Sequence, residues 1–209
     1  MAELARIVYL FGFALLMALV EIEIEGPWGW AEKLPTWYRV DGAAARLYGR
    51  LMSGKPLTGY HAFMLVLPLF AFHLPFVEGL RWSWAAEARL LASYMLWMVA
   101  WDLLWFLFNP AYGWRHFRRG QIWWHNRAWI GRFPIDYYNG VGASLVVAAS
   151  AWLDGRSLAA LGEHARLCAG FAILTAAAAV YAPAYQRWYT RMRTPGTDAR
   201  AEAGIFHRQ

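Results

Sequence analysis

The stretch LLASYMLWMVAWDLLWFLF, residues 90–108, contains a single charged side chain, Asp102. A helix needs about 20 mainly apolar residues to cross the roughly 30 Å hydrocarbon core of a bilayer. The stretch reaches this length once its flanking residues are included, and it therefore predicts a transmembrane helix. Similar apolar blocks occur elsewhere along the chain, at residues 4–20, 62–77, 141–153 and 167–184.

The composition also indicates a membrane protein. The chain is 59% hydrophobic and 16% charged, whereas a soluble domain is typically about 45–50% apolar and about 25% charged. We therefore predict an all-α integral membrane protein built as a bundle of five transmembrane helices. The predicted spans cover residues 4–25, 59–78, 87–109, 137–153 and 165–186. They form a single domain, residues 1–193, and we expect the polar tail at residues 194–209 to be disordered.

The Lys and Arg residues of the connecting segments alternate in number along the chain. The four segments between the five apolar blocks contain five, two, five and two of them, and the segment after the last block, residues 185–209, contains five. Because cytoplasmic loops carry the excess of Lys and Arg, we expect the N-terminus outside and the C-terminus in the cytoplasm, in the cytoplasmic membrane of a bacterium or archaeon. The same rule, together with attraction to anionic membrane lipids, explains the pI near 9.7 without a nucleic-acid partner.

Two connecting segments are expected to be ordered. Residues 28–56 are predicted to include a short interfacial helix after the first span, most regular over Ala43–Leu51. The segment between the third and fourth spans has about 25 residues and is rich in Trp, Arg, His and Pro. A simple connection would need only about four to six residues. We therefore expect this cytoplasmic loop to fold against the membrane surface.

Ionisable residues within membrane spans are costly in free energy and usually functional. Under the predicted orientation, carboxylates and imidazoles from four spans and one loop fall on the cytoplasmic side. Glu21 and Glu25 share a helix face because they are four residues apart. The complete polar set is Glu21, Glu25, His61, Asp102, His116, His125 and Asp136. His73, between Pro68 and Pro75, lies apart from this set, and we expect it to bond a neighbouring helix.

Three interpretations of the polar set remain open. It could bind iron, zinc or manganese, since these ions accept mixed imidazole and carboxylate ligands. It could exchange protons with a substrate, because burial shifts carboxyl groups into the range of useful acids and bases. Its acids could instead form structural ion pairs with neighbouring arginines, such as Arg118 or Arg119. The candidate metal ligands are Glu21, Glu25, His61 and His116. The candidate catalytic groups are Asp102, His125 and Asp136.

The long cytoplasmic loop supplies a second set of candidates, for binding a substrate headgroup. Arginine side chains can hold phosphate or carboxylate groups by paired hydrogen bonds. The candidate headgroup-binding residues are Arg118, Arg119, Arg127, Arg132, Trp124 and Asn126. Contact with the bulk anionic lipid of the membrane is the alternative role for these arginines.

The sequence contains no Glu-x-x-His pair of the kind found in di-iron helix bundles and no nucleophile elbow. The predicted function therefore depends on the polar set. We predict a small membrane-embedded enzyme that acts on a lipid or isoprenoid-like substrate at the cytoplasmic leaflet. The alternative is a non-catalytic assembly subunit, working as a homo-oligomer or with a membrane protein partner. A small transporter is a third possibility, although five spans without an internal repeat fit poorly with inverted-repeat transporters.

Overall fold

The computed structural model describes residues 1–125 and 128–194, and most of them are helical. Three helices are long and apolar enough to cross a membrane, namely α1 (Ala2–Glu25), α5 (Trp84–Phe108) and α9 (Ala159–Met192). The prediction of a helical protein with membrane-spanning helices is confirmed to this extent. The predicted tail lies outside the described residues from position 195 onward.

The predicted span at residues 59–78 is interrupted. It consists of α3 (Gly59–Phe72) and α4 (Leu74–Val77), which are separated at His73. Pro75 lies in the first turn of α4, and because proline has no N–H to donate, it cannot continue the hydrogen bonding of α3. α3 by itself has 14 residues, fewer than the about 20 that a crossing requires.

The predicted span at residues 137–153 is divided in the same way. α7 (Ile135–Ser150) has 16 residues and ends at Ala151, and α8 (Trp152–Gly155) follows at once. Three of the predicted spans are thus continuous helices, and two are helices with a break near one end.

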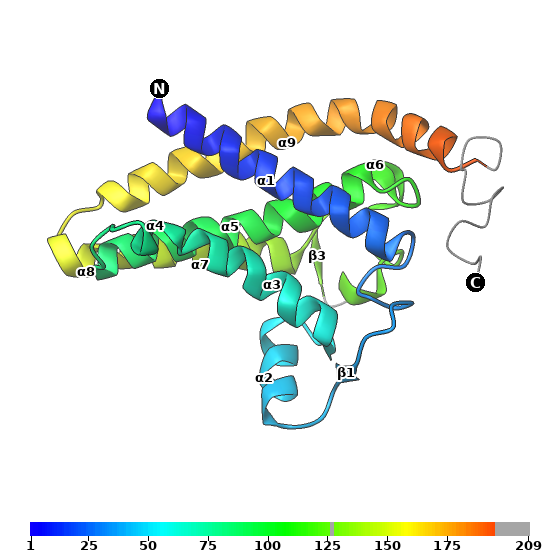
Figure 1. Ribbon diagram of the computed structural model, residues 1–209, viewed down its shortest axis with the longest axis horizontal. Helices are drawn as coiled ribbons and strands as arrows, with labels where there is room; N and C mark the ends of the chain where they lie inside the picture. The colour runs from blue at the N-terminus through cyan, green and yellow to red at the C-terminus, as the bar shows by residue number, and fades with distance from the viewer. Residues whose placement is uncertain (126–127, 195–209) are drawn as a thin grey trace.

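α5 forms the centre of the bundle (Figure 1). It packs against α1, α7 and α9, and less extensively against α3. Its side chains Trp97, Leu104 and Phe106 are fully buried. Figure 1 shows α1, α5 and α9 running in one direction and α3 and α7 in the other. Successive long helices therefore alternate in direction and return to the same two ends.

The two longer connecting segments gather at one end of the bundle, called here the site end (Figure 1). The first contains α2 (Ala43–Leu51), over the residues where the sequence predicts a helix, and β1 (Tyr38–Arg39) and β2 (Leu57–Thr58). These two strands are antiparallel, with Tyr38 opposite Thr58. The second contains α6 (Gly113–His116), the 3₁₀ turn η1 (Trp123–His125), and the antiparallel β3 (Trp129–Ile130) and β4 (Phe133–Pro134).

Two polar residues fix the helix termini at the site end. Thr58 precedes α3, and its hydroxyl accepts a hydrogen bond from the His61 N–H at 3.0 Å, which caps the helix. Asn109 follows α5, and its side-chain amide donates to the carbonyl oxygen of Gly26 at 2.7 Å. Asn109 is buried, and it therefore ties the end of α5 to the end of α1. These contacts set the positions of the side chains that face the space between the helices.

Candidate functional site

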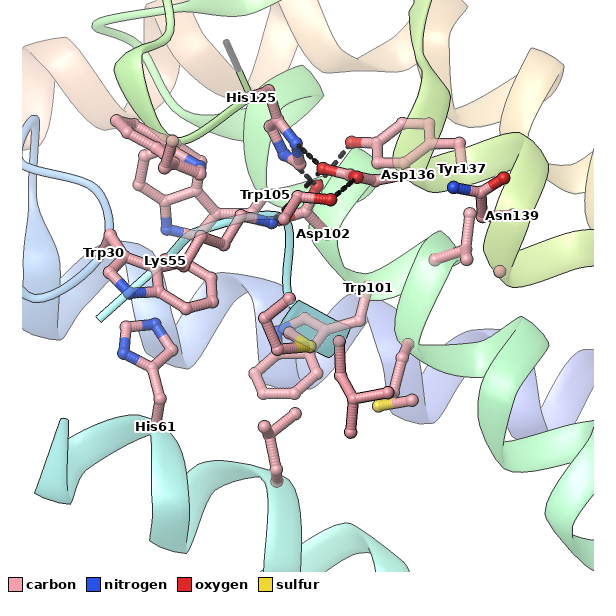
Figure 2. A pocket seen from close by; sticks show the side chains of 18 of the residues that line it. Trp30, Lys55, His61, Trp101, Asp102, Trp105, His125, Asp136, Tyr137 and Asn139 are labelled. Atoms are coloured by element: carbon pink, nitrogen blue, oxygen red, sulfur yellow. Dashed lines mark hydrogen bonds and ion pairs between the residues drawn. The ribbon is translucent and has the colours of Figure 1, made fainter. Parts of the chain in front are cut away.

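A cavity of about 490 Å³ lies between α1, α3, α5 and α7 at the site end. This volume falls within the range of pockets that bind small molecules. One part of its wall is apolar and includes Leu65, Met95, Met98, Val99 and Ala143. The other part contains charged and aromatic side chains from the helices and from both connecting segments (Figure 2). An elongated, mostly apolar molecule with one reactive polar region fits this distribution.

The His125 imidazole lies between two carboxylates (Figure 2). Its Nδ1 is 2.9 Å from Asp136 Oδ2, and its Nε2 is 3.1 Å from Asp102 Oδ2. A carboxylate can only accept a hydrogen bond, so both contacts require a proton, either on each ring nitrogen or on one of the carboxyl groups. His125 is buried, and Trp129 Nε1 donates to its carbonyl oxygen at 2.6 Å, which fixes the backbone of η1. The trio therefore holds a proton at the cavity wall.

Further hydrogen bonds orient the two carboxylates. The Tyr137 hydroxyl donates to Asp102 Oδ2 at 2.5 Å, and the Ser53 hydroxyl donates to Asp136 Oδ1. Lys55 Nζ lies 3.7 Å from Asp136 Oδ2. Burial lowers the pKa of the Lys55 ammonium, and the charges of Asp102 and Asp136 oppose this change. About 32% of the Asp102 side chain remains accessible, and because it lines the cavity, this carboxylate is available to a bound molecule.

A second group of polar residues, Glu21, Glu25 and His61, forms the α1–α3 side of the cavity. All three are buried, and one donor atom from each lies within 4.8 Å of the others. Glu25 Oε1 accepts a hydrogen bond from the Ala31 N–H at 2.6 Å. His61 Nδ1 is 2.8 Å from the Thr58 hydroxyl. His61 is distant in sequence from the two glutamates of α1, and the folded chain brings it to them.

Trp30 connects the two polar groups. Its ring stacks on the His61 imidazole at a centroid distance of 3.9 Å, and Lys55 Nζ lies 4.7 Å from the same ring. Figure 2 shows the indole between these two side chains. An ammonium above an aromatic face is stabilised by the negative charge of that face. The contact therefore couples the position of Lys55 to that of His61.

Most of the residues singled out in the sequence meet at this cavity. Those that line it are Glu21, Glu25, His61, Asp102, Trp124, His125 and Asp136. Among the described residues, no arginine is within ion-pair distance of Asp102 or Glu21, and the partner of Asp102 is His125. The ion pairs expected between these acids and Arg118 or Arg119 are thus not found in this part of the chain.

Other candidates lie elsewhere. His116 is exposed, and its Nδ1 is 2.8 Å from the Tyr112 carbonyl oxygen, so it does not join the other candidate ligands. Arg132 is exposed, and it donates to the carbonyl oxygen of Trp114 and covers that indole at 4.6 Å. The remaining headgroup candidates do not line the cavity or are not described. Arg118 and Arg119 are exposed, and Asn126 and Arg127 lie outside the described residues.

Sequence reasoning missed four polar contributors. Ser53 and Lys55 belong to the segment expected at the membrane interface, where Lys55 was counted only as a topological charge. The Gly54 and Pro56 that flank Lys55 were a signal for a fixed turn. Tyr137 follows the candidate Asp136 directly in the sequence and was not itself a candidate. The fourth is Thr58. The helical spacing of Tyr137 and Ser144 on one face of α7 could have identified Tyr137 as inward-facing.

The chemistry available to this arrangement is proton transfer. Carboxylates, an imidazole, a phenol and an ammonium are linked by hydrogen bonds at the edge of an apolar cavity. Such groups act as general acids and bases when they reach the reacting atom.

Comparisons with protein-family models, with curated proteins and with solved structures find no match to this chain.

Proposed function

We propose that the protein is a small membrane-embedded enzyme that catalyses proton transfer on a lipid or isoprenoid-like substrate. The observation that carries this proposal is the His125 imidazole held between Asp102 and Asp136 at the wall of a largely apolar cavity. A purely structural ion pair has no need of an adjoining volume of about 490 Å³. The accessible carboxylate of Asp102 supports a role for it as the group that meets the substrate.

The reaction class follows from the residues that surround Asp102. With its proton supplied through His125, Asp102 protonates a carbon–carbon double bond, which leaves a carboxylate on Asp102 and a carbocation on the substrate. Loss of a proton from a neighbouring carbon to a carboxylate completes an isomerisation or cyclisation, and no oxidant or reductant is consumed. The indole rings of Trp101, Trp105 and Trp124 line the cavity, and aromatic faces stabilise cations.

The proposed topology is five crossings with the N-terminus outside, the C-terminus in the cytoplasm and the site at the cytoplasmic leaflet. Residues 59–77 and 135–155, each taken as one broken helix, are about 28 and 31 Å long at about 1.5 Å per residue. The alternating direction of the helices (Figure 1) supports this topology. The gathering of two arginine-rich connecting segments at the site end supports the orientation.

Deuterium incorporation tests the proposed proton transfer without knowledge of the substrate. Purified protein in detergent is incubated in ²H₂O with a membrane lipid extract that contains isoprenoids, and the lipids are analysed by mass spectrometry. We expect at least one species to gain deuterium with wild-type protein. Asp102→Asn keeps the shape of the side chain but removes its acid–base function, and it should lower the rate by about 10²- to 10⁴-fold.

The matched control is His73→Gln, at the end of the bundle opposite the site, which should incorporate deuterium at the wild-type rate. Folding of each variant is checked by gel filtration and thermal unfolding. A folded Asp102→Asn protein with an unchanged rate contradicts the proposal, as does a wild-type protein that labels no lipid. In the second case, a membrane protein that co-purifies in stoichiometric amount would support the non-catalytic assembly subunit instead.

A further inference from the structure

The charges around the cavity do not balance. Four carboxylates line it, from Glu21, Glu25, Asp102 and Asp136, and the only Lys or Arg among the described lining residues is Lys55. The Asp102–His125–Asp136 trio holds one proton, so Lys55 and that proton together balance two of the carboxylates. Two negative charges are left on the other side of the cavity.

Glu21 and Glu25 are the two carboxyl groups that would carry these charges when ionised. Both are buried, and within the described chain neither lies within ion-pair distance of a Lys or Arg. Asp102 is close enough for its negative charge to repel a negative charge on either glutamate. Burying carboxylates without a cation is costly in free energy. A single ion of charge +2, or one proton on each carboxyl group, would remove the imbalance.

His61 decides between these two alternatives. Its imidazole is 7% exposed, and its Nδ1 is engaged with the Thr58 hydroxyl at 2.8 Å. Nε2 faces Glu25 Oε1 at 3.9 Å, which is too long for a hydrogen bond, and no other described residue bonds to it. A ring nitrogen that has no hydrogen-bond partner, in a buried side chain that faces two carboxyl groups, is the arrangement of a metal ligand rather than of a proton-sharing pair.

We propose that Glu21, Glu25 and His61 bind one divalent transition-metal ion, of the class of Zn²⁺, Fe²⁺ or Mn²⁺. Ligand atoms lie about 2.0–2.2 Å from such ions, so opposite ligands are about 4.2 Å apart. The three donor atoms already lie within 4.8 Å of one another, and closure onto an ion requires only small side-chain movements. One imidazole and two carboxylates match the preference of these ions for mixed nitrogen and oxygen ligands.

The neighbours of the three ligands resemble the surroundings of known metal sites. The second ring nitrogen of a metal-bound histidine is usually hydrogen-bonded, which fixes the orientation of the ring, and here Thr58 and the stacked Trp30 have this role. The Ala31 N–H fixes Glu25 in the same way. Three protein ligands would leave at least one coordination position open, as in catalytic rather than structural sites, and all three ligands line the cavity.

The metal site and the acid–base trio have no residue in common, but they line the same cavity. It therefore deepens the proposed function, since an open metal position would meet the same bound molecule that Asp102 meets. The binding experiment does not use activity, and the two proposals can fail separately. Asp102→Asn should abolish deuterium transfer and keep the metal, whereas loss of the metal site leaves the trio in place.

Metal binding is measured on the full chain in detergent. The protein is stripped with a chelator and dialysed, and Zn²⁺, Mn²⁺ or, without oxygen, Fe²⁺ is added. Bound metal per chain is measured by elemental mass spectrometry and the affinity by calorimetry. We expect about one ion per chain for at least one of the three metals, and a thermal unfolding temperature that rises with its concentration. Glu25→Gln and His61→Gln should each weaken binding by at least about 100-fold, because even residues that only support ligands contribute about 10- to 100-fold.

The matched control is Glu23→Gln. Glu23 lies on the same helix between the two acidic ligands but is exposed, and its loss should leave stoichiometry and affinity unchanged. The proposal is overturned if wild-type protein binds none of the three metals stoichiometrically, a result that would favour protonated Glu21 and Glu25. It is also overturned if folded Glu25→Gln and His61→Gln proteins bind the metal as tightly as wild type.

Discussion

The two ends of the helix bundle both contain histidines with polar partners, yet only one end contains the cavity. At the end opposite the site, His73 Nε2 lies 3.0 Å from Glu87, and His164 Nε2 lies 2.9 Å from the Ser144 hydroxyl. Neither histidine lines the cavity. At the site end, His125 contacts two carboxylates, and the Nε2 atom of His61 has no hydrogen-bond partner among the described residues.

The difference distinguishes the proposed functional cluster from structural ion pairs in an apolar bundle. At the opposite end, two arginine–glutamate pairs join helices, Arg89 with Glu163 at 3.3 Å and Arg166 with Glu3 at 2.6 Å. Each of these pairs is balanced in charge. Among the described residues that line the cavity, in contrast, four carboxyl groups face a single lysine. Unbalanced charge beside a cavity, and not the presence of polar residues, marks the site.

The largest effect on stability should come from breaking the trio. Asp136→Ala leaves His125 and Lys55 buried without the carboxylate that both contact, and it should lower the free energy of unfolding by about 3 kcal/mol or more. Glu163→Ala removes one partner of a pair that is 43% and 38% exposed, and it should cost less than about 1 kcal/mol. Chemical denaturation in detergent compares the two. Equal losses in the free energy of unfolding would mean that the polar contacts at the two ends contribute equally to stability.

A smaller effect tests how tightly each end is packed. A Cβ atom at Gly29 would lie 2.1 Å from Cη2 of the buried Trp124 ring, whereas one at Gly170 would lie 2.7 Å from Cγ2 of Ile7. Trp124 is packed against Phe106 and cannot move aside, but Ile7 is only partly buried, and its side chain has room to shift. Gly29→Ala should therefore destabilise by about 1–3 kcal/mol. Gly170→Ala should be close to neutral, because alanine gains helix stability of about 0.5–1 kcal/mol over glycine. Thermal unfolding of both variants would contradict this ranking if Gly170→Ala were the less stable protein.

The smallest expected effect is a dependence on pH. Burial lowers the pKa of Lys55 in the folded protein, while the unfolded chain keeps a pKa near 10.4. Between these two values the unfolded state binds more protons, so this lysine makes stability rise with pH across that window. Lys55→Met removes that contribution, whereas Lys33→Met, at an exposed position, should not.

The test follows the unfolding temperature of both variants and wild type from neutral pH to about pH 10. The curves of wild type and Lys55→Met should differ in slope, and those of wild type and Lys33→Met should run parallel. Parallel curves for all three proteins would show that folding does not lower the pKa of Lys55.

The apolar blocks in the sequence predicted the long helices because burial in lipid or protein requires the same uninterrupted run of apolar residues. They did not reveal the breaks at His73 and Ala151. A break near one end of a helix changes few residues and leaves mean hydropathy unaltered. Pro75 carried the signal for the first break, and the alanines around residue 151 carried none.

The sequence could predict the site only through the depth in the membrane at which each polar residue is expected to lie. Helix position along the chain brought Glu21, Asp102 and Asp136 to one end, since helices that alternate in direction share their ends. Depth says nothing about which side chains face each other, however. The exposed His116 and the buried His125 could not be told apart before the fold of the loop was known. The contribution of Lys55 depends on a turn far from its partner in sequence, and no spacing rule reaches that distance.

The burial of α5 also has a consequence for how such a protein assembles. An aspartate at the centre of a lone helix costs about 2.5–3.5 kcal/mol on insertion into a membrane, and less nearer the interface. Asp102 lies in the C-terminal third of α5, among leucines, tryptophans and phenylalanines that compensate for it. In lipid, an unsatisfied polar group favours association with any helix that offers it a partner. α7, which follows later in the chain, offers Tyr137. The carboxylate that resists insertion is thereby the group that selects the neighbour of α5, so that correct assembly and a working site depend on the same hydrogen bond.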